Sequence, residues 1–268
     1  MDDLWRGTTA LVTGASRGIG ASFATALAAR GVRVVLVART AAALEEVAGA
    51  VRSAGGTADV IALDLAQPGA PAALEAEVAR RGLTVDHLVN NAGVGPQGLF
   101  HQLPAAAHLP TIDVNVRAVT ELAARFLPGM VARRRGGIIN VASTAAWQGL
   151  QWIPVYSGSK AFVITWSEAV WVSLRGRGVR CLAVSPGPVA TPFFEHNQLD
   201  VPLPGWLMQS PDTVVRAALR AYERDACHVL PHPAFRLLAW GTRLAPRWLA
   251  ARLGGWYGAP TSPSTPPS

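Results

Sequence analysis

TTALVTGASRGIG, from Thr8 to Gly20, joins a short apolar run to three closely spaced glycines. The run that ends at Thr13 has the length and composition of a buried strand, and apolar residues recur at helical spacing from Phe23 to Ala28. A strand, a glycine turn and a helix form the setting of a phosphate-binding loop, because glycines let the backbone approach a pyrophosphate and the helix start offers free N–H groups. We therefore predict that a cofactor pyrophosphate is held by Gly14, Ser16, Arg17, Gly18, Ile19 and Gly20.

The same alternation of short apolar runs and helical segments continues along the chain. It predicts an α/β fold in one domain, a doubly wound parallel sheet of about seven strands with helices on both faces. The expected strands are Thr8–Thr13, Val32–Val37, Thr57–Leu63, Asp86–Val89, Gly137–Ala142, Val179–Val184 and Cys227–Leu230. Helices are expected at Ala41–Ala54, at Leu103–Arg135 with an interruption near Pro110, from Pro154 onward, and at Pro211–Arg224.

Composition limits the classes of protein to which the chain can belong. Apolar residues make up 50% of its 268 residues and charged residues 15%, which suits a buried sheet and is too apolar for a disordered chain. Two cysteines, Cys181 and Cys227, indicate a reducing compartment, so we expect a cytoplasmic protein without a signal sequence or membrane span. The formal charge of +7 comes from scattered arginines whose only run is Arg133–Arg135, and we expect no nucleic-acid partner and no metal.

The end of the second expected strand bears on the choice of cofactor. An NAD site is expected to carry a carboxylate there for the ribose 2′-hydroxyl, but the residues are Ala38, Arg39 and Thr40. Arg39 and Arg17 could instead pair with a 2′-phosphate, which favours NADP(H). The alternative is that Arg39 begins a helix and faces water.

Two further polar residues occupy positions that call for an explanation. Asp64 follows the third expected strand and could accept a hydrogen bond from the adenine amine, or could cap the next helix. Asn115 lies in the apolar segment from Ile112 to Val116, although asparagine is a poor helix former. A hydrogen-bonding role for Asn115 and a local distortion of the helix are the two interpretations.

Tyr156 and Lys160 place a phenol and an ammonium one helical turn apart. The 24 basic residues are all arginine except Lys160, and lysine can relay a proton whereas arginine cannot. We expect this cation to stabilise the phenolate and so to lower the pKa of the tyrosine. Ser143 directly follows the fifth expected strand, and only twelve residues separate it from Tyr156, so its side chain can reach the same crevice. A surface helix with an unrelated Tyr and Lys is the alternative.

Taken together, these segments resemble the short-chain dehydrogenase/reductase family from Thr8 to about Leu230. The matching motifs occur in family order: Thr13–Gly20 as the cofactor loop, Asn90–Gly93 as the central-strand motif, Pro186–Gly187 as the nicotinamide-side turn, and Asn115, Ser143, Tyr156 and Lys160 as the catalytic tetrad. The resemblance implies that Ser143 holds a carbonyl oxygen, Tyr156 donates a proton to it, Lys160 steadies the tyrosinate and binds ribose, and Asn115 helps to hold a water. It also implies cofactor contacts from Leu65, Asn90, Tyr156, Lys160, Pro186, Val189 and Thr191.

The substrate is expected to be a bulky, apolar ketone or alcohol. Aromatic residues follow Ser143 and the sixth strand in segments too apolar for ordinary loops, and the irregular segment after Pro192 is interpreted as a lid. Within the family, the motifs look similar to the branch that reduces steroid-like or long-chain 3-oxoacyl ketones. The residues expected to line the substrate pocket are Ser143, Trp147, Trp152, Phe193 and Trp206.

The carboxyl-terminal part mixes Leu and Trp with arginines in a basic amphipathic pattern that is broken at Pro246. We divide the chain into an NADP-binding catalytic domain at residues 1–230, a helical extension of it at 231–258, and a disordered Pro/Ser tail at 259–268. Packing of the extension over the substrate mouth or in a dimer is favoured over contact with a membrane surface. The apolar helix after Tyr156 indicates a homo-oligomer. A regulatory or membrane-docking protein without turnover, and an epimerase or dehydratase, are the alternative functions.

Overall fold

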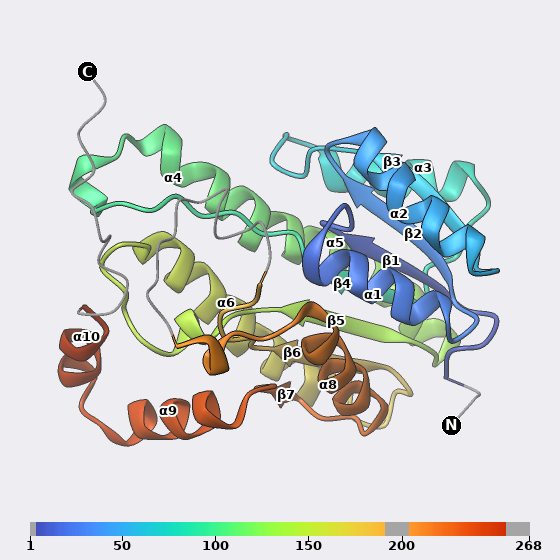
Figure 1. The fold of residues 1–268 in the computed structure, drawn as a ribbon. Coiled ribbons are helices and arrows are strands. Elements are labelled where there is room, and N and C mark those ends of the chain that lie inside the picture. The colour runs from blue at the N-terminus through green and yellow to red at the C-terminus, as the bar shows by residue number, and fades with distance from the viewer. Residues whose placement is uncertain (1–3, 191–203, 256–268) are drawn as a thin grey trace.

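The structure, a computed structural model, describes residues 4–190 and 204–255. Seven strands form one sheet in the order β3-β2-β1-β4-β5-β6-β7, and every neighbouring pair is parallel (Figure 1). The chain therefore has the predicted doubly wound fold, with the reversal of strand order between β1 and β4. The strands are β1 (Thr9–Thr13), β2 (Arg33–Ala38), β3 (Ala58–Ala62), β4 (His87–Asn90), β5 (Gly137–Val141), β6 (Arg180–Val184) and β7 (His228–Val229).

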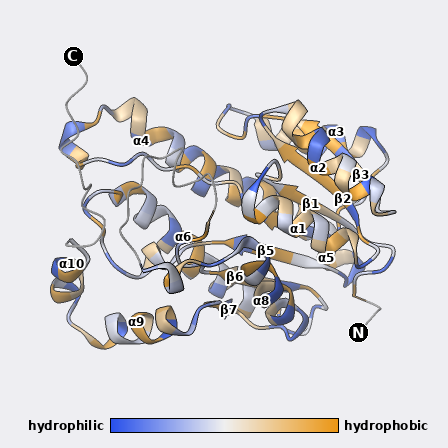
Figure 2. Ribbon diagram, viewed as in Figure 1, coloured by the Kyte–Doolittle hydropathy of each residue, from blue (hydrophilic) through white to orange (hydrophobic). Residues whose placement is uncertain are grey.

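Both faces of the sheet are covered, which explains why its strands are almost continuously apolar. Successive residues of β1 illustrate this: Leu11 packs into the core on one face, and Val12 packs into the core on the other. The helices on the Val12 face are α1 (Gly18–Ala28), α2 (Ala41–Ser53) and α8 (Pro211–Glu223). Those on the Leu11 face are α3 (Ala70–Arg80), α5 (Val119–Arg133) and α6 (Pro154–Ser173). Figure 2 shows the hydrophobic strands enclosed between helices of mixed hydropathy.

All seven strands lie within one residue of their predicted bounds at each end, and α6 begins at Pro154 as predicted. For α3, in contrast, no bounds were predicted, although a helix after Asp64 was considered. Its sequence is rich in alanine, and Leu74 and Val78 are the only large aliphatic side chains that it buries. Two such residues at a spacing of four give too weak a periodic signal to identify a helix.

The long helical segment before β5 is interrupted later than the sequence predicted. Pro110 lies inside α4 (Ala105–Ile112), and the interruption is a π-helix at Asp113–Ala118 that leads directly into α5. The prediction of a break near Pro110 was therefore wrong by a few residues. Asn115 lies within the π-helix, a conformation that often occurs at functional sites.

The carboxyl-terminal segment forms two helices, α9 (Pro233–Leu244) and α10 (Arg247–Gly255). They are separated at Pro246, as predicted. Both helices lie at the end of the molecule that carries α4 (Figure 1). The tail predicted to be disordered lies outside the described residues. None of the helices in the two described ranges is long and apolar enough to cross a bilayer.

A substitution at Gly20 tests the close contact between the start of α1 and the end of β1. A Cβ at this position would overlap the carbonyl oxygen of Gly14 and lie 2.6 Å from Asn91 Nδ2. Gly20→Ala should therefore lower the free energy of unfolding by about 1–3 kcal/mol, measured by urea denaturation. Gly49→Ala in α2 is the matched control, because a Cβ there meets nothing within 4 Å. The control should leave stability unchanged or raise it, and equal losses in both variants would contradict the packing argument.

Candidate active site

A cavity of about 740 Å³ lies at the carboxyl ends of the strands. Its walls come from the glycine loop after β1, the ends of β2 and β3, the segment after β4, the end of β5, the start of α6 and the turn after β6. Since the strand order reverses between β1 and β4, this is where a doubly wound sheet binds its ligand. The cavity is lined by most of the predicted site residues, namely Gly14, Ser16, Arg17, Gly18, Ile19, Arg39, Asp64, Leu65, Ser143, Tyr156, Lys160, Pro186 and Val189.

The glycine loop has the geometry of a phosphate-binding turn. Gly14 has a φ of 64°, and an added Cβ would lie 2.9 Å from the Cα of Ala92. Gly20 is buried against Gly14 rather than lining the cavity. The loop therefore presents backbone at the start of α1, where N–H groups without helical partners favour an anion. These features fit the pyrophosphate of a dinucleotide.

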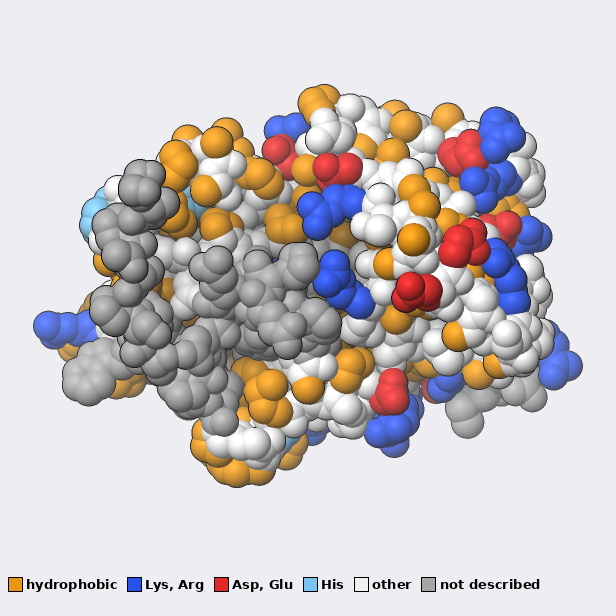
Figure 3. Space-filling view, turned by 45° about the horizontal axis from the view of Figure 1, so that its top comes forward, with side chains coloured by type: hydrophobic (Ala, Val, Ile, Leu, Met, Phe, Trp, Pro, Cys, Tyr) orange, Lys and Arg blue, Asp and Glu red, His pale blue; other side chains and the backbone are white. Residues whose placement is uncertain are grey.

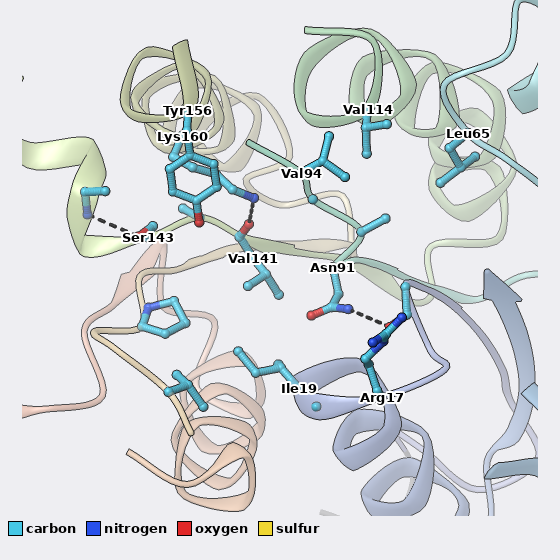
Figure 4. Close-up of a pocket in the computed structure, with 18 of the residues that line it drawn as sticks. Arg17, Ile19, Leu65, Asn91, Val94, Val114, Val141, Ser143, Tyr156 and Lys160 are labelled. Carbon is cyan, nitrogen blue, oxygen red and sulfur yellow. Dashed lines mark hydrogen bonds between the residues drawn. The ribbon is translucent and has the colours of Figure 1, made fainter. Parts of the chain in front are cut away.

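Asn91, rather than Asn90, faces the cavity. Asn91 Nδ2 donates to the carbonyl oxygens of Thr13 (2.9 Å) and Gly14 (3.2 Å) and so ties the end of β4 to the glycine loop (Figure 4). The side chain of Asn90 is buried, and its Nδ2 donates to Asn140 Oδ1 on β5 at 2.9 Å. The assignment of Asn90 as a cofactor contact is therefore corrected. Both asparagines belong to one predicted motif, and only the direction of each side chain distinguishes them.

The adenosine end of the cavity combines two arginines with one carboxylate. Arg17 and Arg39 are exposed and line the cavity, and no carboxylate in the described part of the chain lies within ion-pair distance of either. Asp64 Oδ1 accepts a hydrogen bond from the backbone N–H of Ala66 at 3.1 Å. Asp64 shapes a turn and does not cap the next helix, because α3 begins after Gly69.

Tyr156, Lys160 and Ser143 lie together on the inner wall of the cavity (Figure 4). Lys160 is buried, and its Nζ donates to the carbonyl oxygen of Val141 at 2.7 Å. The same Nζ lies 5.7 Å from the centroid of the Tyr156 ring. A Cβ at Gly95 would lie 2.8 Å from Tyr156 Cδ2, so the backbone after β4 packs directly against the ring. The phenol is thus held between a cation and a hydroxyl.

Electrostatics in this group differ from the sequence-based expectation. Burial raises the pKa of Tyr156 to about 12, and a hydrogen bond with Ser143 partly offsets this effect. Burial also lowers the pKa of Lys160 to about 8. The phenol therefore keeps its proton at neutral pH, and Lys160 titrates nearest to physiological pH. The expected lowering of the pKa of Tyr156 is not found, because desolvation by burial outweighs the hydrogen bond with Ser143.

Asn115 does not line the cavity but stabilises its wall through hydrogen bonds. Its Oδ1 accepts from the N–H of Val94 at 3.0 Å, and its Nδ2 donates to the carbonyl oxygen of Val94 and to Ser159 Oγ, both at 2.9 Å. Ser159 Oγ in turn donates to the carbonyl oxygen of Tyr156 at 2.7 Å. Both interpretations of Asn115 therefore hold, since it lies in a distorted helix and also makes buried hydrogen bonds. These hydrogen bonds connect the segment after β4, at Val94, to the start of α6, at Tyr156 and Ser159.

The outer end of the cavity is apolar, but the predicted tryptophans do not line it. Trp147 stacks on His228, with ring centroids 5.5 Å apart, and Arg243 lies over its ring at 4.8 Å. Trp152 and Trp206 are also absent from the lining, and Trp206 is largely exposed. Thr191 and Phe193, like most of the proposed lid, lie outside the described residues. The apolar lining at this end includes Pro110, Leu150, Ile153, Phe235 and Leu238.

Two contributions to the site were missed because they depend on long-range contacts. Gln209 is buried, and its Oε1 accepts from the N–H of Gly187 at 3.0 Å, which fixes the turn after β6. Phe235 of α9 reaches the cavity and lies where a Cβ on Gly187 would be. No motif marks Gln209 or Phe235, and both are far from Gly187 in the sequence. Phe235 and Leu238 bring the carboxyl-terminal extension to the cavity wall, one of the two packings that the sequence favoured.

Comparisons with known proteins agree with this geometry. Residues 8–201 match the family model described as short chain dehydrogenase. The ketoacyl reductase HetN of Nostoc sp. is 35% identical over 84% of this chain and 78% of its own length. The very-long-chain 3-oxoacyl-CoA reductase of Bos taurus is 29% identical over 95% of this chain and 80% of its own length.

Among solved structures, a short-chain dehydrogenase from Sphingobium yanoikuyae in complex with NADPH is 34% identical to the chain. It superimposes with a TM-score of 0.79, and the match covers 88% of this chain and 94% of the solved one. The sequence thus matches one family over most of its length. The same chain has the sheet order, the glycine loop and the group of Ser143, Tyr156 and Lys160 described above. The chain belongs to the short-chain dehydrogenase family of oxidoreductases.

Proposed function

We propose that the protein is an NADPH-dependent oxidoreductase that interconverts a bulky, apolar ketone and its secondary alcohol. The observation that carries this proposal is the position of Tyr156, beside Ser143 and Lys160, on the wall of the cavity that begins at the glycine loop. A ketone needs a proton donor at its oxygen when hydride reaches its carbon. A nicotinamide cofactor, when bound, supplies the hydride.

Four residues have different roles in protonating the substrate oxygen. Ser143 Oγ holds the substrate oxygen, and the Tyr156 hydroxyl gives it a proton. The raised pKa of Tyr156 keeps that proton in place until the substrate oxygen becomes basic. Lys160 provides a positive charge near the resulting tyrosinate, where low polarity strengthens the interaction. Asn115 keeps this arrangement rigid through Val94 and Ser159.

Preference for NADPH is proposed from the two exposed arginines at the adenosine end. Arg17 and Arg39 line the cavity, and the end of β2 offers no carboxylate to a ribose 2′-hydroxyl. Guanidinium groups bind phosphate through paired, charge-assisted hydrogen bonds. The NADPH complex of the Sphingobium yanoikuyae relative supports the same choice.

Substitution of these arginines should change the discrimination between the two cofactors. Arg17→Ala and Arg39→Ala should each weaken NADPH binding about tenfold and leave NADH binding nearly unchanged, with solvent screening limiting the effect. Dissociation constants can be measured from the fluorescence of the reduced cofactor. Arg52→Ala is the control, because Arg52 lies on α2 and pairs with Glu45, away from the cavity. Equal losses for NADPH and NADH would remove the 2′-phosphate argument.

A large, apolar substrate is proposed from the outer end of the cavity. Leu150, Ile153 and Phe235 offer it hydrophobic contacts without a charged group among them. The name of the Bos taurus relative also fits a long apolar substrate. A spectrophotometric screen of ketones graded by size, with NADPH oxidation as the readout, tests both this proposal and turnover. An epimerase or dehydratase would leave bulk NADPH unconsumed, as would a protein without turnover.

Assembly and location are proposed from two separate observations. Helix α6 exposes Phe162 and Val172, and a homo-oligomer that covers this helix would bury both. The free cysteines Cys181 and Cys227 are consistent with a reducing compartment such as the cytoplasm.

A further inference from the structure

Helix α9 has an apolar face that nothing in the described part of the chain covers. Its inner side is fixed by the buried residues Phe235 and Ala239. On its outer side Leu237, Trp240 and Leu244 are 77%, 71% and 84% exposed. Their spacing of three and four residues places the three side chains on one face of the helix. Figure 3 shows hydrophobic side chains gathered at the lower edge of that view, in the part of the molecule where α9 lies.

Helix α10 also exposes apolar side chains, and it is itself packed against the protein. A Cβ at Gly254 would lie 2.8 Å from the carbonyl oxygen of Gly149, and Gln151 Nε2 donates to the carbonyl oxygen of Gly255 at 2.6 Å. On its outer side Trp248 and Leu253 are nevertheless exposed. The exposed side chains therefore belong to helices that are anchored to the protein. We call Leu237, Trp240, Leu244, Trp248 and Leu253 the outer face.

The charged residues of α9 and α10 are all arginine. The sequence contains no Asp or Glu after Asp225. Arg243 lies over Trp147, 3.9 Å from Glu168. The other three arginines of the two helices have no carboxylate within ion-pair distance among the residues that the structure describes; they are Arg236, Arg247 and Arg252.

Helix α9 also forms part of the cavity mouth. Phe235 and Leu238 line the cavity, and Leu238 is itself about half exposed. Across the mouth, Pro110 of α4 lines the same cavity, and its neighbour Leu109 is exposed. Whatever covers the outer face will therefore lie next to the entrance for an apolar ligand.

We propose that the outer face docks on an anionic lipid bilayer, with α9 and α10 lying in the plane of the interface. Exposed Trp and Leu with flanking arginines are typical of helices that lie in this way, and two helices of 12 and 9 residues are too short to span the hydrocarbon core. A symmetric dimer through this face would bring the arginines of one copy against those of the other, and α9 and α10 themselves carry no acidic residue to offset them. The favoured occupant is therefore an anionic membrane surface rather than a second copy.

Docking would place the cavity mouth against the lipid, so that an apolar ketone could enter from the bilayer. This consequence rests on the proposed function, whereas docking itself does not. Vesicle binding needs neither cofactor nor turnover. Failure of docking and failure of the ketone reductase assignment can therefore be distinguished, because turnover is measured separately, without vesicles, by NADPH oxidation across the screen of ketones graded by size.

Co-sedimentation of the full chain with vesicles tests the proposal. Vesicles of phosphatidylcholine alone and vesicles that also contain anionic phosphatidylglycerol are compared. The comparison separates the apolar from the electrostatic contribution to vesicle binding. We expect binding to the anionic vesicles that weakens as salt is raised. The double variant Leu237→Ser/Trp240→Ser should lose at least tenfold in binding. Val172→Ser is its control, since Val172 is 62% exposed on α6 and outside the outer face.

Charge is tested with two variants of equal net charge. Arg247→Glu/Arg252→Glu should weaken binding to anionic vesicles by well over tenfold, since each arginine near such a surface contributes about fivefold. Arg216→Glu/Arg220→Glu on α8 changes the net charge equally and should bind like the parent. Equal losses from both pairs, or binding that survives Leu237→Ser/Trp240→Ser, would overturn the proposal. Self-association through the outer face without vesicle binding would overturn it as well, in favour of a second copy.

Discussion

Tyr156→Phe should lower kcat for ketone reduction by about 10²- to 10⁴-fold, the usual contribution of a positioned general acid. The substitution removes only the hydroxyl, so the ring can keep its packing against Gly95. Binding of NADPH should be nearly unchanged, because the phosphate and adenosine parts of the cavity are built by other residues. Steady-state reduction of a ketone and a separate measurement of cofactor affinity test the two parts of this prediction.

Tyr222→Phe is the matched control for the loss of a buried phenol. The Tyr222 hydroxyl lies 2.9 Å from His87 Nδ1 in the core, and Tyr222 does not line the cavity. Its removal should lower the free energy of unfolding by about 1–3 kcal/mol, since it leaves a buried partner unpaired, and should spare kcat in the folded enzyme. If Tyr156→Phe retained full activity with an unchanged KM, Tyr156 would not be the proton donor.

The fold could be predicted closely because each strand is marked by the residues of its own short segment of the sequence. A parallel sheet buried on both faces needs continuous apolar runs, and those runs marked all seven strands within one residue at each end. The bounds of α3 were not predicted because its buried side is mostly alanine. The change of helix type at Asp113 was placed near Pro110 because proline usually breaks a helix. The hydrogen bonds of Asn115 to Val94, distant in the sequence, accompany the actual distortion.

The site residues that belong to short sequence motifs could be predicted. The residues whose place in the site depends on the direction of a side chain, or on contacts between distant parts of the chain, could not. Ser143, Tyr156 and Lys160 meet because the end of β5 and the start of α6 are adjacent. Trp147 was assigned to the substrate pocket for its apolar character, yet it stacks on His228 of β7. The cavity end is instead closed by Phe235, which only the path of α9 could reveal.

Lys160→Met should lower kcat/KM for reduction by about 10²- to 10³-fold, comparable to the loss of a preorganised electrostatic group. The cation is buried and lies 5.7 Å from the Tyr156 ring. In the proposed mechanism, the charged form of Lys160 stabilises the tyrosinate that remains after proton transfer. The loss also leaves the carbonyl oxygen of Val141 without its donor. Lower activity alone could therefore result from a changed structure of the cavity wall at Val141 rather than from the lost charge. The dependence of activity on pH separates these two causes.

In the proposed mechanism, reduction requires a proton on Tyr156 and a charge on Lys160. Burial lowers the pKa of Lys160 to about 8 and raises that of Tyr156 to about 12, so Lys160 loses its proton first as the pH rises. The kcat/KM of the parent should accordingly fall as the pH rises through about 8. In Lys160→Met the small residual activity should show no such fall, because the titrating group is gone. Lys160→Arg, whose charge persists at alkaline pH, should also lack the fall while keeping more activity than the methionine variant. A fall near pH 8 that persists in Lys160→Met would assign the titration to another group and remove the lysine cation from the proposed mechanism.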